Sequence, residues 1–462
     1  MIFSSWQYLI FFIAVFTLIM LLKSNKLQKG ILLIASYFFY GFWDYRFLFL
    51  MFIMSFVSYF IGNKIYESTE KKKKWLTLGI VFNLSVLGFF KYFNFFIGSL
   101  NSLLANLHVK LSFLEIILPV GISFITFEVI SYTIDIYRGS NKPAKTFWDL
   151  ALLVAFFPHL VAGPILKPSH FLPQLDNRIT FSWDNIERGI QLFLLGLVKK
   201  VLIADRLALF ADPVFKNPVE YSSITVWLAV IAYALQIYCD FSGYSDMALG
   251  SAKCFGFDIP LNFNLPYISK NITEFWRRWH ISLSTWLREY LYIPLGGNRK
   301  GKTRQYLNLA IVMLLGGLWH GASWNFVVWG GLHGIGLAVH KIFMDFTGKK
   351  NNAPSGPFTI FNWAVTFCFV CLAWVFFRSS DFSVSWFMVQ KMLFLTNWEG
   401  VNWYATSLLV IIPIMVAGHF LNPNKYTLNL NTFSGVFILI FTLLALVFLA
   451  PFTASPFIYF QF

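Results

Sequence analysis

Long apolar stretches separated by short polar segments run along almost the whole chain. These stretches lie near 2–22, 30–43, 46–63, 75–98, 113–137, 147–166, 186–206, 224–250, 306–329, 331–346, 358–377, 404–420 and 433–452. A perpendicular membrane span needs roughly 20 residues, so those near 30–43, 147–166 and 331–346 are predicted to be tilted, paired or re-entrant. The alternation typical of a membrane β-strand is not visible. The pattern therefore predicts an all-α, polytopic membrane protein with about 11 transmembrane helices.

Two segments in the middle of the chain interrupt this pattern. Residues 158–173 hold four prolines, and residues 239–300 interleave polar and aromatic side chains. Irregular backbone at membrane depth is tolerated only where protein buries it or where it lines a wet cavity. We expect re-entrant or interfacial helices there, within a single integral-membrane domain over 1–462. Its parts are an N-terminal bundle over about 1–145, a core over about 146–346 and C-terminal helices over about 347–462.

The composition supports lipid as the main solvent. Hydrophobic residues make up 57% of the 462 residues, charged residues 12%, and the mean hydropathy is +0.64. Soluble chains are roughly 25% charged, so this chain has too little charge to cover several soluble domains. Disordered, collagen-like and disulfide-rich classes are excluded by the same composition.

The net charge of +15 comes from 36 basic and 21 acidic residues, and the basic residues gather in short clusters between apolar stretches. The clusters are Lys23, Lys26 and Lys29; Lys71 to Lys74; Lys199 and Lys200; Arg299 to Arg304; and Lys349 and Lys350. Cytoplasmic loops of membrane proteins carry such an excess of lysine and arginine. Nucleic acid is not an expected partner, because no stretch pairs this charge with a soluble domain.

The charge clusters also predict how the chain crosses the membrane. The stretch 2–22 lacks the basic n-region and the cleavage site of a secretory signal, is long enough to span and is followed by basic residues. We therefore expect it to remain in the mature protein, with the N-terminus outside and the loop near Lys26 in the cytoplasm. The turn at 43–46 is then outside, Lys71 to Lys74 inside, and 98–112 outside.

No metal or nucleotide motif is present in the sequence. Cys368 and Cys371 form C-x-x-C inside an apolar stretch without a second ligand pair, so packing is the better interpretation. His280 and His320 are 40 residues apart, with no obvious third ligand. There is no P-loop, no dinucleotide fingerprint, no nucleophile elbow and no H-E-x-x-H. We expect no metal site.

His320 is the strongest candidate for chemistry. It lies near the middle of the apolar segment 313–334, where a polar side chain is costly and suggests a functional site. Glycines surround it, and His333 lies in a second glycine-flanked position. Trp324, four residues after His320, is expected to share its helical face. The alternative is a packing histidine bonded to a backbone carbonyl.

His280 is the second candidate. If 274–290 is one helix, Trp276 and His280 fall on an apolar stripe and Arg277 lies on a neighbouring face. The arginines would then reach headgroups or an anionic ligand. An interfacial amphipathic helix explains the arginines equally well, but it does not explain a histidine on the apolar stripe.

Four acidic residues also lie in or beside apolar stretches. Asp240 and Asp246 could form an ion or proton path, or serve as caps or arginine partners, and the structural role is favoured. Glu128 and Asp135 are seven residues apart on one helical face, and pairing with arginine or lysine is expected for them.

Five segments, in order along the chain, resemble the membrane-bound O-acyltransferase (MBOAT) family, and within it the bacterial branch of the alginate O-acetyltransferase membrane subunit. These segments are 118–139, 156–175, 238–250, 262–301 and 316–334. The resemblance implies a fold of tilted helices around a central tunnel. It implies that His320 is the catalytic histidine and that His280 is the second catalytic position. Further candidates, not carried over from the family, are Trp319, Trp324, Asn325, Trp276, Trp279, Asp240 and His333 for the substrate tunnel. Arg277, Arg278, Arg299 and Lys300 are candidates for holding the donor, with screened loop charge as the alternative.

The resemblance further implies the reaction and its setting. An acetyl group would move from acetyl-CoA, or another cytoplasmic acyl thioester, to an extracytoplasmic polysaccharide, with no tightly bound cofactor. Transfer would be direct or through a partner acetyltransferase of the SGNH type, in the bacterial inner membrane with lipid around the chain. The alternatives are a transporter or flippase of an acyl or glycan intermediate, and a scaffold that anchors such a partner. Visible repeat symmetry, which would favour a transporter, is absent.

Overall fold

A computed structural model of the chain describes residues 1–107, 110–161, 163–348, 357–404, 411, 413, 428–430, 432–450 and 457–458. Within these residues the protein is built from helices, and extended backbone pairs only in the isolated bridge between Tyr221 and Val401. The all-α prediction is therefore confirmed for the described part of the chain. The apolar stretch near 404–420 lies largely outside the described residues.

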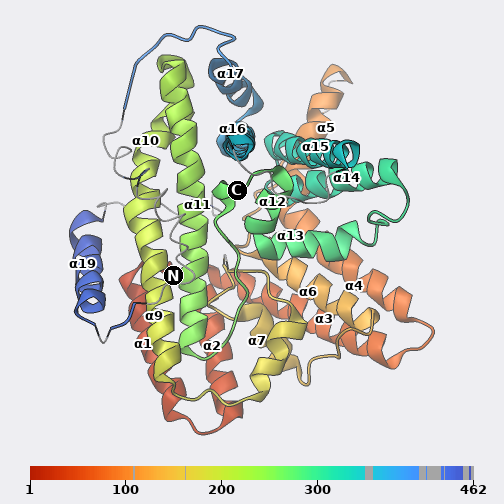
Figure 1. Cartoon of the computed structure of the whole chain (residues 1–462). Coiled ribbons are helices and arrows are strands. Elements are labelled where there is room, and N and C mark those ends of the chain that lie inside the picture. The colour runs from red at the N-terminus through yellow and green to blue at the C-terminus, as the bar shows by residue number, and fades with distance from the viewer. Residues whose placement is uncertain are drawn as a thin grey trace. The chain divides into compact units, whose positions relative to one another are not determined.

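The chain forms two compact units, which we call the N-terminal unit (1–193 and 247–260) and the C-terminal unit (194–246 and 261–462). The helix α11 (Ser223–Cys254) contributes residues 223–246 to the C-terminal unit and its last turns to the N-terminal unit. Figure 1 shows α11 as one of the longest helices of the chain.

The N-terminal unit consists of helices joined by turns and by longer irregular segments. They are α1 (Trp6–Leu21), α2 (Asn25–Asp44), α3 (Leu48–Glu67), α4 (Lys72–Leu87), α5 (Phe93–Leu104), α6 (Ile122–Tyr137), α7 (Phe147–Ala155), α8 (Pro168–Phe171) and most of α9 (Trp183–Leu197). Residues 113–119, expected to belong to a helix, form no regular secondary structure, and the helix begins only at Ile122. Gly121 explains the late start, because its left-handed backbone (φ 75°) immediately precedes α6.

The C-terminal unit also consists of helices. They are α10 (Asp205–Lys216), most of α11, α12 (Ile272–Arg278), α13 (Ile281–Leu287), α14 (Lys302–His320), α15 (Trp324–Thr347), α16 (Pro357–Arg378), α17 (Phe382–Met392) and α19 (Phe433–Leu449). Short π-helical segments cover 198–204 and 288–292.

Five helical stretches among the described residues are long and apolar enough to cross a membrane. They are Asn25–Glu67, Lys72–Leu107, Ser223–Cys254, Trp324–Thr347 and Phe358–Arg378. The first contains two helices, since the chain breaks at Asp44, whose carboxylate accepts from the Arg46 N–H at 3.0 Å. Large apolar side chains are exposed on such helices, and on α19 Phe433 is 88% exposed. A surface of this kind is suited to lipid, and the chain is a multi-span membrane protein.

The interior of the N-terminal unit centres on α6, in which nearly every side chain is buried. Glu128, within α6, lies 3.2 Å from the imidazole Nδ1 of His159 and accepts from the Leu166 N–H at 3.2 Å. His159 Nε2 lies 2.8 Å from the Leu153 carbonyl oxygen. Arginine or lysine was the expected partner of Glu128, whereas its described partners are His159 and a backbone N–H. These contacts hold the proline-rich segment 158–173 against α6.

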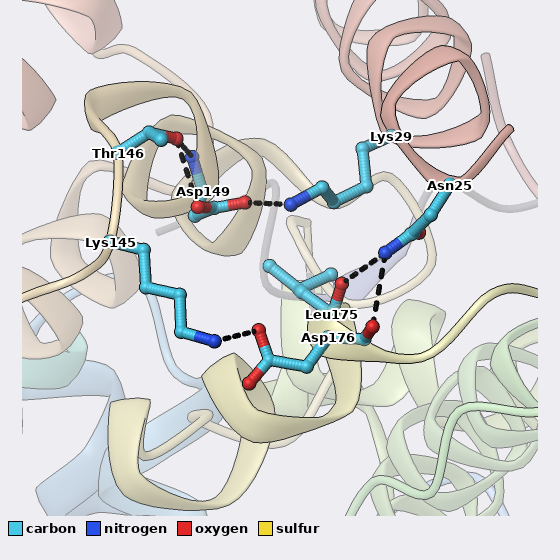
Figure 2. Close-up of polar contacts among 7 residues, drawn as sticks. All are labelled: Asn25, Lys29, Lys145, Thr146, Asp149, Leu175 and Asp176. Atoms are coloured by element: carbon cyan, nitrogen blue, oxygen red, sulfur yellow. Dashed lines mark hydrogen bonds and ion pairs between the residues drawn. The ribbon is translucent and has the colours of Figure 1, made fainter.

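Polar contacts join α2, α7 and the turn at 172–176 at one edge of the N-terminal unit (Figure 2). Lys29 on α2 forms a 2.6 Å ion pair with Asp149 in the first turn of α7. Asn25 donates to two backbone carbonyls of the turn at 3.0 and 3.2 Å, and Lys145 pairs with Asp176 at 2.8 Å. Together these bonds fix the starts of α2 and α7.

Buried ion pairs connect the π-helical segment 198–204 to α11 in the C-terminal unit. Lys199 pairs with Asp246 at 2.6 Å, and Lys200 pairs with Asp205 at 2.8 Å and with Asp240 at 2.7 Å. This agrees with the structural interpretation of Asp240 and Asp246, with lysine in the place of arginine. Because breaking a buried pair leaves an uncompensated charge, these contacts fix segment 198–204 against α11.

Candidate active site

Close packing of α14 on α15 positions the first candidate, His320. A Cβ on Gly317 would overlap the Phe326 carbonyl oxygen, and a Cβ on Gly330 would overlap the Met313 carbonyl oxygen. The missing side chains therefore let the two backbones touch, as small residues do between membrane helices. His320 is the last residue of α14, and its ring lies 5.0 Å, centroid to centroid, from that of Trp329 on α15.

The chain breaks between His320 and Trp324. Gly321 has extended backbone (φ −160°, ψ 152°), and Ser323 caps α15 by accepting from the Asn325 N–H at 3.2 Å. Trp324 begins the next helix and is 60% exposed, whereas His320 is buried. The prediction that Trp324 shares a helical face with His320 is therefore wrong, because the two residues belong to different helices.

The imidazole of His320 lies in an aromatic cage. Its ring centroid is 5.0 Å from that of Trp319, 5.0 Å from that of Trp329 and 5.2 Å from that of Phe377. A second imidazole, that of His280, lies beside His320. The centroids of the two rings are 6.4 Å apart and the angle between their planes is 73°. The structure thus brings the two predicted histidines together from positions 40 residues apart in the sequence.

His280 lies at a break between helices. The prediction of one helix over 274–290 is wrong, since α12 ends at Arg278 and α13 begins at Ile281. His280 has left-handed backbone (φ 43°, ψ 57°), and its Nδ1 accepts from the Leu283 N–H at 3.3 Å as the N-cap of α13. A cap of this kind satisfies a helix N–H that would otherwise lack a partner.

The cap also assigns the tautomer of His280. In a neutral imidazole one nitrogen accepts and the other carries the proton. Because Nδ1 accepts from the Leu283 N–H, Nε2 carries the proton and acts as a donor. The ring packs against Phe241 at 4.8 Å and Trp319 at 6.0 Å. His280 is thus oriented as a buried hydrogen-bond donor.

Trp276 and His333 extend the same cluster. The indole Nε1 of Trp276 donates to Nδ1 of His333 at 3.3 Å, and Trp329 lies between His333 (4.7 Å) and His320 (5.0 Å) by ring centroids. Trp276 and His333 were predicted from the sequence, whereas Trp329 was missed. A signal was present, because Trp329 lies four residues before His333 and so shares its helical face.

Three other predicted tunnel residues have structural contacts. Asn325 donates to the Ser379 carbonyl oxygen at 3.1 Å, and Asp240 is held by Lys200. Trp279 is buried, with its ring centroid 5.0 Å from that of Phe263. Their role in a tunnel stays a prediction.

The four residues predicted to bind the donor are exposed or half-buried. Arg278 pairs with Glu274 at 3.0 Å and donates to the Asn264 carbonyl oxygen at 3.1 Å. Arg277, Arg299 and Lys300 are exposed. No described contact joins any of the four to His280 or His320, and their role in donor binding stays a prediction.

The arrangement is suited to acid–base chemistry on a buried ligand. A neutral imidazole can take a hydroxyl proton near neutral pH, and a second imidazole can donate a hydrogen bond to the same ligand. Among the described residues, no group of three His, Cys, Asp or Glu side chains is placed to hold a metal ion.

Comparison with known proteins assigns the chain to a family. The family model described as "MBOAT, membrane-bound O-acyltransferase family" matches residues 152–378, a range that includes both histidines. The chain is 44% identical over 405 residues to the probable alginate O-acetylase AlgI of Pseudomonas aeruginosa, covering 86% of this chain and 76% of the relative. It is 42% identical over 399 residues to the peptidoglycan O-acetyltransferase of Helicobacter pylori. This match covers 80% of this chain and 74% of the relative.

A more distant relative is the teichoic acid D-alanyltransferase of Bacillus subtilis, which is 27% identical over 272 residues, covering 57% of this chain and 69% of the relative. The identity to the first two proteins extends over most of both chains. The chain is therefore an O-acyltransferase that belongs to the membrane-bound O-acyltransferase family.

Proposed function

We propose that this protein moves an acetyl group from a cytoplasmic thioester, acetyl-CoA, to an extracytoplasmic polysaccharide, either directly or through a partner acetyltransferase. The observation that carries the proposal is the buried pair of histidines, His280 and His320, with ring centroids 6.4 Å apart. The names of the relatives, an alginate O-acetylase and a peptidoglycan O-acetyltransferase, support acetyl as the group and a glycan as the final acceptor.

In the proposed mechanism His320 is the general base. It takes the proton of an acceptor hydroxyl, whose oxygen attacks the thioester carbonyl carbon. Collapse of the tetrahedral intermediate breaks the carbon–sulfur bond, and the proton held on His320 passes to the departing thiolate. General base catalysis of this kind contributes roughly 10²–10⁴-fold to the rate.

His280 has a different role in this mechanism. Its Nδ1 accepts from the Leu283 N–H, so in the neutral ring Nε2 carries the proton and can only donate. A protonated ring nitrogen can donate a hydrogen bond to a substrate oxygen, but it cannot accept a proton from a hydroxyl group. We therefore assign His280 to orienting the acceptor or stabilising developing charge.

The setting of the reaction follows from the charge pattern. The basic clusters support an inner-membrane protein with its N-terminus outside and its lysine-rich loops in the cytoplasm, where an anionic thioester donor is made. An SGNH-type acetyltransferase and the polysaccharide are the proposed extracytoplasmic partners.

The test is acetyl transfer by purified protein supplied with radiolabelled acetyl-CoA. His320→Ala is expected to lower thioester turnover by about 10²-fold or more, because the general base is lost. The matched control is His170→Ala, since His170 is exposed and lies outside the cluster. Wild-type turnover by His320→Ala, with normal membrane insertion, would refute the assignment of the base.

A transporter of an acyl or glycan intermediate is the competing function. Asp240 and Asp246, which pair with Lys200 and Lys199, favour it, because they lie in a helix long and apolar enough to cross a membrane and ionisable groups in such helices often mark ion paths. The same assay separates the two functions. A transporter would leave the radiolabelled thioester intact, whatever residue occupies position 320.

A further inference from the structure

Two buried N–H groups on α15 lack an acceptor within the described part of the chain. They are the indole Nε1 of Trp329 and the imidazole Nε2 of His333. Both residues are 0% exposed. They lie four positions apart on one helix and therefore on one face of it. Buried polar groups are nearly always hydrogen-bonded, so two neighbouring exceptions require an explanation.

The contact between Trp276 and His333 fixes the proton on Nε2. An indole N–H can only donate, and the indole of Trp276 points to Nδ1 of His333 at 3.3 Å. Nδ1 must therefore hold a lone pair, and the neutral ring carries its proton on Nε2. Phe275 stacks on the His333 ring at 6.0 Å with an interplanar angle of 8°, which further holds the ring. Both unsatisfied groups are thus donors, and both require an oxygen or another acceptor.

These donors lie beside the proposed base. The ring of Trp329 is 4.7 Å from the ring of His333 and 5.0 Å from the ring of His320, centroid to centroid. Trp329 is therefore in contact with both histidines. A ligand oxygen that accepted from Trp329 would be bonded to a ring that contacts His320.

We infer that Trp329 and His333 form an oxygen-binding donor pair that holds the acyl carbonyl oxygen of the thioester substrate. This inference rests on the proposed acyl transfer. When the hydroxyl oxygen attacks the carbonyl carbon, the π electrons of the carbonyl bond move to that oxygen. The two N–H groups then donate to an oxyanion, and the donation ends when the carbon–sulfur bond breaks and the carbonyl forms again. Donors aimed at the developing oxyanion contribute roughly 10²–10³-fold each to kcat.

The test compares the binding of two unreactive analogues by calorimetry in nanodiscs. Acetyl-dethia-CoA keeps the carbonyl but replaces the thioester sulfur by methylene, whereas S-ethyl-CoA keeps the sulfur and lacks the carbonyl. Trp329→Phe and His333→Phe each remove one N–H and keep an aromatic ring. We expect each variant to lose about tenfold or more in affinity for acetyl-dethia-CoA. Affinity for S-ethyl-CoA should stay at the wild-type value, which also shows that the variants are folded.

Two further variants sharpen the result. His333→Gln places an amide N–H near the position of Nε2 and should recover part of the affinity for acetyl-dethia-CoA. Trp386→Phe removes an indole N–H from a half-exposed residue of α17 and should bind both analogues as the wild type does. With acetyl-CoA as substrate, the Phe variants at 329 and 333 should lower kcat more than they raise KM.

The possible failures are distinguishable. If the Phe variants bind acetyl-dethia-CoA as tightly as the wild type, the two donors bind a buried water and not the substrate. That result would overturn this inference and leave the proposed acyl transfer standing. Equal losses for both analogues would also overturn it, because the effect would not depend on the carbonyl. If wild-type protein binds neither analogue, the acyl-thioester donor itself is refuted, and this inference fails with it.

Discussion

At the scale of single residues, His280 has a structural task and, in the proposed mechanism, a chemical one. Its Nδ1 caps α13 and its backbone is left-handed, so the break between α12 and α13 depends on it. The same hydrogen bond to Nδ1 fixes the orientation of the imidazole ring and leaves its proton on Nε2. A substitution that keeps the cap but shortens the side chain separates these tasks.

His280→Asn is expected to fold normally and to lose activity. Asparagine adopts left-handed backbone readily and is among the best N-caps, so the thermal unfolding temperature should stay close to that of the wild type. Its amide N–H lies nearer the backbone than imidazole Nε2, so acetyl transfer should fall by at least about tenfold. His280→Ala should lose the activity and also about 1 kcal/mol of capping free energy. Full turnover by His280→Asn would reduce His280 to a structural role.

At the scale of helices, the apolar pattern predicted where helices lie better than where they end. The stretch near 358–377 lies within α16, and that near 224–250 lies within α11. The breaks at His280 and after His320 were missed, because each depends on one residue's backbone and a local cap. Hydrophobic periodicity averages over a turn or more and is insensitive to such a break.

The contact of α14 with α15 gives a second prediction, at this scale. Gly330→Ala adds a Cβ that overlaps the Met313 carbonyl oxygen, so the helices must separate. We expect a loss of about 1–3 kcal/mol in unfolding free energy, together with reduced acetyl transfer as His320 moves from Trp329. Gly331→Ala is the matched control, because its Cβ would meet only Leu314, at an ordinary 3.6 Å. Thermal unfolding in detergent, read alongside turnover, measures both effects, and equal stability of the two variants would contradict close helix packing.

At the scale of the whole molecule, the family, the helical class and the two histidines were within reach of sequence alone. His320 and His280 stood out because polar residues on apolar faces are costly in lipid. Trp329 did not stand out, because a tryptophan in an apolar stretch is ordinary. Its place four residues before His333 was a weak signal, and its contacts with His320 and His333 make its position clear. The direction in which the chain crosses the membrane rests on charge alone and can be tested directly.

Cysteine labelling measures that direction. Tyr45, at the α2–α3 turn, is 76% exposed, and Lys73, in the first turn of α4, is also exposed. Between them α3 has 20 residues and spans about 30 Å, the thickness of the hydrocarbon core. The two sites should therefore lie on opposite sides of the membrane, with the basic one inside.

The background for labelling is Cys368→Ser, since Cys368 is exposed and the other three cysteines are buried. In that background, Tyr45→Cys should react with a membrane-impermeant maleimide in intact cells, after removal of any outer membrane. Lys73→Cys should react only once the inner membrane is opened. The reverse pattern would place the lysine clusters outside, away from cytoplasmic acetyl-CoA, and would contradict the proposed direction of acetyl transfer even if His320 proved essential.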